Sequence, residues 1–371
     1  MMTWGGAAAA GLAALPAGPA RAAREGEMNI LCWEGYNSAQ VLDPFRAATG
    51  ARVRAESLTN DPTMINRLRA GETATWDLIN VNNPWARKVM APEGLIRPLP
   101  RAEFEPFFDA MLPAFKAPYR WAMSEDGRDL LGMAQRFGPF SFVVDTDRIA
   151  RATAEDQGWD LFNDPGLDGR YGIFDSDDWN VFNLFLIAGL DPFRAHDAAG
   201  MQRFRDTTER VVRGAKMIGD MAMMNQALVS GEIDLHMTGG VYSVSPARAD
   251  GFSNLRAITP LRGPMDGRGG ISWIEITSTV NNPALSPRAT EFLKFVQSPE
   301  MAHAVAFAEG TFNPVAQMGD PACFARFTTA ELEAIQWDSL EEDMARSAEY
   351  DIVPDYDEAL AILTAAKRLR G

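Results

Sequence analysis

Cysteine and histidine are scarce in this chain, which has 2 Cys and 3 His among 371 residues. Cys32 and Cys323 stand far apart, and the sequence contains neither a CxxC pair nor a cluster of Cys and His. This pattern argues against a zinc site. A disulfide between the two cysteines remains open, but two separate buried thiols are the favoured interpretation. We predict neither a metal nor a cofactor.

Motifs of common enzymes are missing as well. The chain has no GxSxG nucleophile elbow, no GxxxxGK[ST] phosphate loop and no HExxH zinc motif. The stretch GPMDGRGG lacks the GxGxxG spacing, and DSDDWN departs from a calcium-binding loop at its fifth and sixth positions. An aspartate or glutamate can still serve as a general base. An enzyme that uses Glu34 or Asp177 therefore remains an alternative.

Positive charge is in deficit, since 35 Lys and Arg face 50 Asp and Glu and the net charge is −15. Such acidity argues against nucleic acid and anionic membrane surfaces as partners, and it permits a cationic ligand. Beyond the N-terminal stretch, apolar runs of transmembrane length are also missing. The stretch VFNLFLIAGL, residues 181–190, is too short and predicts a core helix.

The N-terminal stretch has a composition of its own. Residues 4–23 are small and apolar and contain Ala20-Arg21-Ala22, an A-x-A cleavage pattern. We interpret residues 1–22 as a secretory signal peptide, although the basic segment that normally precedes the apolar run is missing. The interpretation predicts export to the periplasm, by the general or the twin-arginine route. A plain Ala/Gly tail is the alternative.

Strand and helix patterns alternate from residue 28 onward. Apolar runs predict strands at 28–33, 51–58 and 76–81, and helical spacing predicts helices at 39–50, 62–72 and 83–94. This order predicts a parallel sheet flanked by helices. Ligands of such sheets bind beyond the carboxyl ends of the strands. Trp33–Tyr36 and Asn82–Asn83 each follow a strand directly, so we expect both segments at one edge of the sheet.

The rest of the chain mixes the same kinds of element. Patterns predict strands at 130–137, 140–144, 171–174, 233–238 and 269–280, and helices from about 179, at 201–217, within 286–310 and at 356–371. The last helix ends in a basic turn, which suits the helix dipole.

Aromatic side chains and carboxylates occur together at three places, two that follow a predicted strand and one within a strand. They are the loop from Trp33 to Tyr36 around Glu34, the acidic turn Asp175–Asp178 before Trp179, and the alternating pair Trp273 and Glu275 on one strand face. Carboxylates neutralise ammonium groups through charge-assisted hydrogen bonds, and aromatic faces attract the same cations. Each feature also has a plainer interpretation, as a core cap, a helix N-cap or a core tryptophan. Their recurrence favours a cleft that binds an amine.

The residues quoted next carry a resemblance to a known family. NILCWEGYNSAQVLDPFRAATGARV, AGETATWDLINVNN, SGEIDLHMTGGVYS and above all GGISWIEITSTVNNPALSPRATEFLKFVQSPEMAHAV are similar to segments of periplasmic solute-binding proteins of ABC importers. The spermidine/putrescine-binding group resembles the chain over about residues 28–370. The resemblance implies that Glu275 recognises an amine and that Trp273 packs on the carbon chain of the ligand.

The chain also departs from that family. The usual first loop is Trp-Thr-Glu-Tyr, whereas Glu34 here lies one place earlier. Asn82 and Asn83 stand where the family has Ser and Tyr, and the Thr238-Gly239-Gly240 region lacks a cleft Trp, with Tyr242 nearby. These departures concern the identity of the ligand more than the fold.

We therefore expect an α/β protein with the two-lobed, type II periplasmic-binding-protein fold. Each lobe is a mixed sheet flanked by helices, with a ligand cleft between the lobes. Lobe one is predicted as 28–138 and 276–312, and lobe two as 139–275 and 313–371. The chain crosses between the lobes near Phe137–Phe140, near Glu275 and near Asn313.

The predicted function is capture of a small cationic amine by hinge closure and delivery to an ABC permease in the inner membrane, by a monomer. A polyamine such as putrescine or spermidine is the first candidate. Within the same fold, an amino acid-like zwitterion, a quaternary ammonium compound or a thiamine-like cation is the alternative, because Asn82 and Asn83 could hold a carboxylate. The predicted ligand-binding residues are Trp33, Glu34, Tyr36, Asn82, Asn83, Asp175, Asp177, Asp178, Thr238, Tyr242, Trp273, Glu275 and Asn313.

Overall fold

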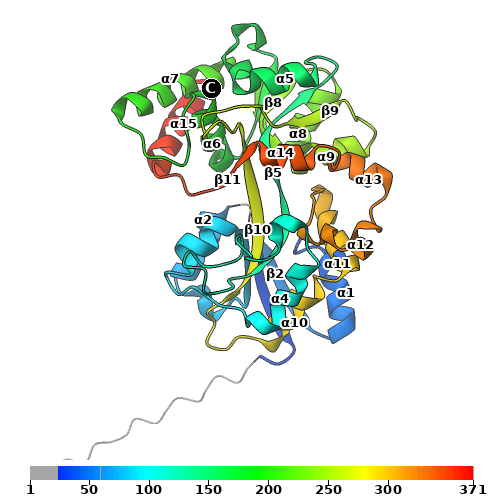
Figure 1. Ribbon diagram of the computed structural model, residues 1–371. Helices are drawn as coiled ribbons and strands as arrows, with labels where there is room; N and C mark the ends of the chain where they lie inside the picture. Colours follow the sequence, from blue (N-terminus) through cyan, green and yellow to red (C-terminus); the bar gives the residue numbers. More distant parts are fainter. Residues whose placement is uncertain (1–23, 59, 371) are drawn as a thin grey trace, which may run out of the picture.

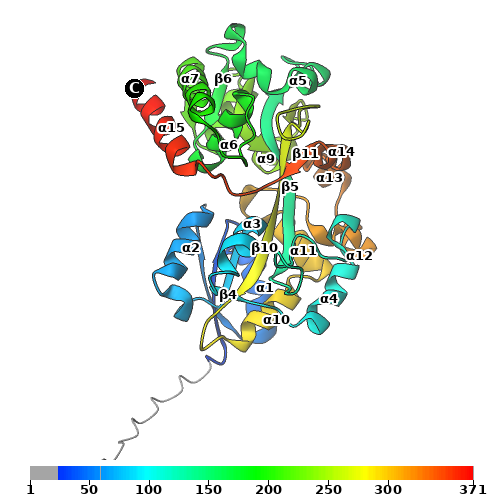
Figure 2. The ribbon, with the colours of Figure 1, turned by 60° about the vertical axis from the view of Figure 1, so that its left-hand side comes forward.

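The computed structural model describes residues 24–58 and 60–370 and shows two α/β lobes, one above the other in Figure 1. The predicted signal peptide, residues 1–22, lies outside the described residues. Two long antiparallel strands, β5 (Met133–Asp145) and β10 (Gly270–Val280), run from one lobe into the other. Figure 2 shows the same pair joining the lobes from a second direction. The space between the two lobes lies beside these two strands.

The strands form a sheet with the order β2-β1-β3-β10-β5-β8-β6-β7, to which β4, β9 and β11 add at the sides. β1 pairs in parallel with β2 and β3, as the alternation of strands and helices predicts. β10 pairs antiparallel with β3, which makes the sheet mixed. The strands are β1 (Glu27–Cys32), β2 (Arg52–Ser57), β3 (Leu78–Asn82), β4 (Ile96–Arg97), β6 (Tyr171–Phe174), β7 (Met217–Gly219), β8 (Leu235–Gly240), β9 (Leu255–Ile258) and β11 (Ser347–Glu349).

Helices cover the sheet in both lobes (Figure 1). They are α1 (Ala39–Thr49), α2 (Asp61–Arg69), α3 (Asn83–Trp85), α4 (Arg101–Asp109), α5 (Arg151–Gln157), α6 (Asp177–Ile187), α7 (Ala198–Gly214), α8 (Met221–Val229), α9 (Val241–Ala249), α10 (Pro287–Phe295), α11 (Pro299–Ala306), α12 (Pro321–Phe324), α13 (Thr329–Ala334), α14 (Leu340–Ala345) and α15 (Tyr356–Arg370). Shorter turns include the π-helical η2 (Ala86–Met90), which continues α3, and the 3-10 turns η3 (Pro113–Phe115) and η7 (Ala316–Gly319).

Local sequence signals explain where the first helix begins and ends. The Ser38 side chain accepts a hydrogen bond from the Val41 N–H at the start of α1. Gly50 ends the helix with φ 67°, a left-handed conformation that glycine adopts without steric cost. Val41, Leu42 and Phe45 form the buried face of the helix. This places the loop after β1 directly in front of a well-anchored helix.

One segment lies in a different lobe from the one predicted. The sequence predicts residues 313–327 in lobe two, but the Leu112 N–H donates to the Ala316 carbonyl at 2.8 Å, and Gln317 donates to the Ala134 carbonyl at 2.9 Å. A Cβ on Gly319 would lie 2.1 Å from the Met111 carbonyl carbon, so the backbones are in close contact. Phe312 exchanges hydrogen bonds with Ser245 of α9 where the two lobes meet, and beyond α12 Arg248 of α9 donates to the Glu333 carbonyl of α13. The third crossing therefore follows α12 rather than Asn313.

A second difference concerns β5, where the sequence predicts two strands with a break at Gly138-Pro139. The structure has one continuous strand, in which Pro139 pairs with Ser272 of the neighbouring β10. Gly138 lies opposite Trp273 in the strand register, and a Cβ there would be 3.6 Å from the Trp273 indole. The indole of Trp273 therefore packs directly against the backbone at Gly138.

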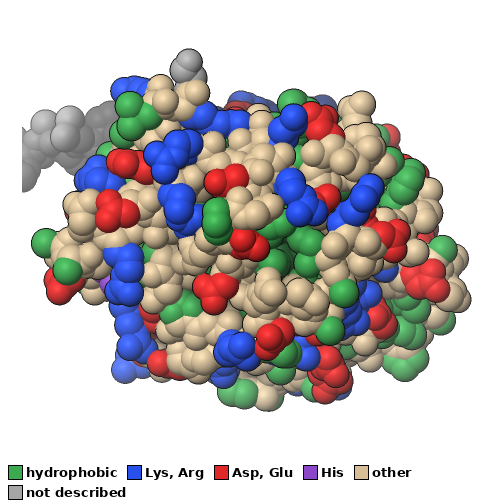
Figure 3. Space-filling view, turned by 90° about the horizontal axis from the view of Figure 1, so that it is seen from above, with side chains coloured by type: hydrophobic (Ala, Val, Ile, Leu, Met, Phe, Trp, Pro, Cys, Tyr) green, Lys and Arg blue, Asp and Glu red, His purple; other side chains and the backbone are tan. Residues whose placement is uncertain are grey.

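The two cysteines are buried and free, so the interpretation as separate thiols is confirmed. Within residues 24–58 and 60–370, no group of three or more His, Cys, Asp or Glu side chains could hold a metal ion. The same residues contain no helix with the length and apolar character needed to cross a membrane. On the face of the molecule shown in Figure 3, acidic and basic side chains are interspersed.

Candidate functional site

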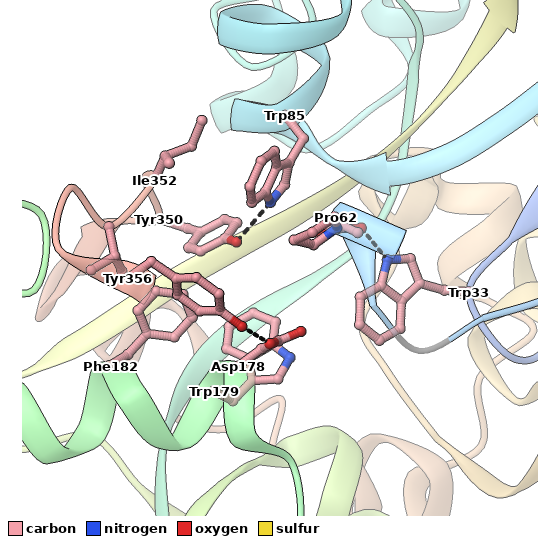
Figure 4. Close-up of a pocket in the computed structure, with 11 residues that line it drawn as sticks. Trp33, Pro62, Trp85, Asp178, Trp179, Phe182, Tyr350, Ile352 and Tyr356 are labelled. Carbon is pink, nitrogen blue, oxygen red and sulfur yellow. Dashed lines mark hydrogen bonds between the residues drawn. The ribbon is translucent and has the colours of Figure 1, made fainter. Parts of the chain in front are cut away.

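Two adjoining cavities lie between the lobes, on one side of β5 and β10. The first, which we call the polar compartment, has a volume of ≈ 370 Å³. It is lined by Trp33, Glu34, Asn82, Arg136, Trp179, Tyr242, Trp273, Glu275 and Asn313. The second, the aromatic compartment, has a volume of ≈ 480 Å³. It is lined by Trp33, Asp61, Pro62, Trp85, Asp178, Trp179, Phe182, Tyr350, Ile352, Val353 and Tyr356 (Figure 4).

Most of the residues predicted to bind the ligand are brought together here. Those that line the polar compartment are Trp33, Glu34, Asn82, Tyr242, Trp273, Glu275 and Asn313. Asp178 lines the aromatic compartment. The register explains part of this gathering, because Glu275 of β10 lies opposite Asn82 at the end of β3. The carboxyl-end rule for parallel strands thus places the β1 loop and the end of β3 beside the same cavity.

The other predicted residues line neither compartment. Tyr36 is buried beneath Arg136, whose guanidinium carbon is 4.6 Å from the centre of the tyrosine ring. Asn83 is fully buried, and Thr238 exchanges hydrogen bonds with Asn180 and Asn183 inside lobe two. The carboxylates of Asp175 and Asp177 both accept from Lys367, one of the basic residues in the last turn of α15.

Arg136 is the main functional residue that the sequence did not reveal. Its Nε donates to one oxygen of Glu275 at 3.0 Å, and a terminal nitrogen donates to the other at 3.1 Å. Both side chains are buried. Burial raises the pKa of the Glu275 carboxyl while Arg136 opposes the rise, and the pKa of Arg136 is raised by Glu275 although burial alone would lower it. The signal available in the sequence was that Arg136 is the single basic residue of β5.

Several polar atoms of the polar compartment are buried without a hydrogen-bond partner among the described residues. They include three acceptors, which are one carboxylate oxygen of Glu34 and the amide oxygens of Asn82 and Asn313. The indole N–H of Trp273 and the hydroxyl of Tyr242 are also unpaired. Buried polar atoms in folded proteins are nearly always hydrogen-bonded. A ligand that supplies several donors, and at least one acceptor, fits this set.

Asp61 is a second residue that the sequence did not single out. It is the first residue of α2, a position at which an acidic side chain is common in any helix. Its carboxylate accepts from the Trp33 indole N–H at 2.7 Å and from the Asn82 side-chain amide at 2.8 Å. Burial raises the pKa of Asp61 to about 7, although the hydrogen bonds from Asn82 and Trp33 lower it. Asp61 therefore fixes the orientation of two residues that line the polar compartment.

Aromatic rings from both lobes enclose the aromatic compartment. Trp85 comes from lobe one, and its indole N–H donates to the hydroxyl of Tyr350 at 2.9 Å across the gap between the lobes. Figure 4 shows these two side chains pointing toward one another, and Tyr356 pointing toward Asp178. Burial raises the pKa of the Asp178 carboxyl. A second interlobe contact, between Lys88 and Asp351 at 2.5 Å, lies on the same side.

The comparison with protein families identifies what kind of protein this is. Residues 40–327 match the model of the bacterial extracellular solute-binding proteins. The chain belongs to this family. The family resemblance noted from the sequence is thereby confirmed. Among curated proteins, no sequence matches the chain.

Solved structures share the fold of this solute-binding protein. A putative spermidine/putrescine ABC transporter protein from Listeria monocytogenes is 16% identical with a TM-score of 0.70, and the match covers 91% of this chain and 99% of that one. PotD, a spermidine/putrescine substrate-binding protein from Streptococcus pneumoniae, is 15% identical with a TM-score of 0.64, covering 93% and 99%. The binding protein AgtB from A. tumefaciens, in complex with agropinic acid, is 16% identical with a TM-score of 0.59, covering 92% and 99%.

These neighbours confirm the two-lobed periplasmic-binding-protein fold. Membership of a solute-binding family also decides between the function classes that the sequence left open: the chain is a binding protein and not an enzyme. The enzyme alternative that used Glu34 or Asp177 is therefore wrong. The arrangement of the cleft fits binding, since carboxylates, amides and aromatic faces from both lobes meet around a small volume.

Proposed function

We propose that this solute-binding protein is the periplasmic component of an ABC importer and that it captures a small cationic amine between its lobes. Hinge closure encloses the ligand, and the closed form is presented to a membrane permease. The protein acts as a monomer after export. A polyamine such as putrescine or spermidine is the first candidate, since two structural neighbours are named as spermidine/putrescine proteins.

The observation that carries the proposal is the set of unpaired acceptors in the polar compartment. The oxygens of Glu34, Asn82 and Asn313 are three buried acceptors around one small cavity, and an ammonium group has three N–H donors to offer. Glu275 is neutralised by Arg136, so Glu34 provides the net negative charge among the charged groups that line this compartment. Hydrogen bonds to a charged group contribute about 1.5–3 kcal/mol each.

The rest of the ligand extends into the aromatic compartment in this proposal. Trp33 and Trp179 line both compartments, so a carbon chain that starts at the ammonium can continue between them. Asp178 lines this compartment, and its carboxylate is the partner for a second amine. Aromatic faces add about 0.5–2 kcal/mol for each cation that they contact.

A zwitterion with an amino acid-like end is the second candidate. It is favoured by the guanidinium of Arg136 and the unpaired indole N–H of Trp273, both of which line the polar compartment and could contact a carboxylate. The agropinic acid complex of AgtB shows that a neighbour with the same fold binds a ligand other than a polyamine.

A thermal-shift screen tests the proposal, because a ligand that binds only the folded state raises the melting temperature by mass action. The screen compares putrescine and spermidine with betaine, amino acids and thiamine, using protein without residues 1–22. We expect saturable stabilisation by the amines. A shift with anions and none with any cation would contradict the proposal.

The variant Glu34→Gln tests whether the charge of Glu34 contributes to amine binding. Loss of the charge should weaken binding of the best amine at least about tenfold, which corresponds to roughly 1.4 kcal/mol, as measured by calorimetric titration. Asp175→Asn is the control, because Asp175 carries the same charge but bonds to Lys367 and lines neither compartment. Equal loss of affinity in both variants would show that only the total charge of the protein matters.

A further inference from the structure

A third cavity is larger than either compartment of the cleft. This third cavity, which we call the back cavity, has a volume of ≈ 1420 Å³. Its walls are Leu112, Pro113, Ala114, Phe115, Arg120, Trp121, Phe137, Arg268, Ser272, Ile274, Trp337, Leu340, Glu341, Met344, Ala345, Ser347 and Glu349. Of this space, ≈ 600 Å³ is accessible to a water-sized molecule, which lies within the roughly 300–1,000 Å³ of pockets that hold small molecules. The back cavity therefore has the dimensions of a ligand site.

The back cavity lies on the opposite face of the interlobe strands from the cleft. Successive side chains of a strand point to opposite faces. On β10, Trp273 and Glu275 line the polar compartment, whereas Ser272 and Ile274 line the back cavity. On β5 the adjacent Arg136 and Phe137 divide in the same way. The two sites thus share the strands that connect the lobes.

Both lobes contribute walls to the back cavity. Lobe one supplies η3 and the buried Phe115 and Trp121, while lobe two supplies α14 with Leu340 and the half-buried Trp337. A rotation about the interlobe strands that opens the cleft moves these walls toward one another. An occupant of the back cavity would resist that movement.

The charges at the rim indicate what kind of molecule fits. Two basic and two acidic side chains line the cavity, which are Arg120, Arg268, Glu341 and Glu349. Arg120 and Glu349 neutralise one another at 2.6 Å. The remaining pair has no net charge either, so the rim selects neither an anion nor a cation. The apolar walls and the balanced rim fit an uncharged apolar body.

We propose that the back cavity is a second ligand site, which takes an uncharged, largely apolar small molecule and stabilises the closed form of the protein. Its occupant and the cleft ligand never touch, because the strands β5 and β10 separate them. Each would bind the closed form better than the open one, so each raises the affinity of the other by the same factor.

The neutral apolar fluorophore N-phenyl-1-naphthylamine is a probe for this site. Titration of the protein should give a saturable rise in fluorescence. Ala114→Trp and Ala345→Trp fill the cavity from lobe one and lobe two, and both alanines are exposed, so the fold tolerates the larger side chain. Each variant should weaken probe binding at least tenfold. Ala199→Trp, an exposed position on α7 away from the cavity, should leave the binding unchanged.

Three results would overturn the proposal. The first is no saturable binding to the unmodified protein, and the second is equal binding to all three tryptophan variants. The third is displacement of the probe by a saturating cleft ligand, which would place the probe in the aromatic compartment. If the probe binds in the back cavity without changing the dissociation constant of the cleft ligand, the coupling between the sites is overturned. Failure of the amine screen leaves the fluorescence test of the cavity intact.

Discussion

At the scale of single residues, Asp61 links the chemistry of the cleft to pH. Burial raises its pKa to about 7 in the folded protein, whereas an aspartate in an unfolded chain has a pKa near 3.8. The folded state therefore holds a proton that the unfolded state has lost between these two values. The contribution of Asp61 to stability is full below about pH 4, falls as the pH rises toward 7 and changes little above that.

Asp61→Asn removes this dependence. As the pH rises from about 4 to about 7.5, the unmodified protein loses unfolding free energy and the variant does not. The difference between the two should therefore grow in favour of the variant by up to roughly 4 kcal/mol, at about 1.4 kcal/mol for each unit of pKa difference. Urea unfolding at several pH values measures the gain. Asp250→Asn, at an exposed aspartate, should show no such slope. Parallel stability curves for the unmodified protein and Asp61→Asn would mean that Asp61 is ionised throughout this range.

At the scale of secondary structure elements, the buried pair between Arg136 of β5 and Glu275 of β10 ties the two interlobe strands together. Arg136→Met keeps the length of the side chain but leaves the Glu275 carboxylate buried without its partner. Removing one member of a buried ion pair typically costs about 3–5 kcal/mol, while replacing both by uncharged side chains costs much less. We expect urea unfolding to show a loss of this size in Arg136→Met and a partial recovery when Glu275→Gln is added.

Arg128→Met provides the control, since Arg128 forms an exposed ion pair with Asp126. Exposed pairs contribute about 0–1 kcal/mol, so this variant should unfold almost as the unmodified protein does. Similar losses in Arg136→Met and Arg128→Met would show that water reaches Glu275. A double variant as unstable as the single one would show that the packing of Arg136, and not its charge, is what matters.

The same elements show how far the sequence could predict the structure. Alternating strands and helices were predictable from apolar periodicity, and the carboxyl-end rule brought Trp33 and Asn82 to one cavity. The partner of Glu275 was not predictable, because Arg136 lies 139 positions away in the sequence and meets it only through the register between β5 and β10. The residues 313–327 contact lobe one through backbone groups such as the Ala316 carbonyl, and such contacts leave no pattern in the side chains.

At the scale of the whole molecule, contacts that span the lobes decide how often the cleft is closed. The hydrogen bond from Trp85 to Tyr350 and the ion pair of Lys88 with Asp351 join lobe one to the segment after β11. Such contacts exist only while the lobes are close. They therefore add to the stability of the closed form alone, and the affinity for a ligand that requires closure changes with them.

Tyr350→Phe tests this link, because it removes the hydroxyl that accepts from Trp85 at 2.9 Å and keeps the ring. The closed form should lose about 0.5–1.5 kcal/mol, so the dissociation constant of the cleft ligand should rise by about 2- to 10-fold, and the ligand-free protein should show a larger radius of gyration in X-ray scattering. Tyr171→Phe is the matched control, since the Tyr171 hydroxyl donates to the Val211 carbonyl at 2.7 Å within lobe two. It should lower the unfolding free energy by a similar amount without changing the radius of gyration. If both variants scatter alike, the bond between Trp85 and Tyr350 has no part in closure.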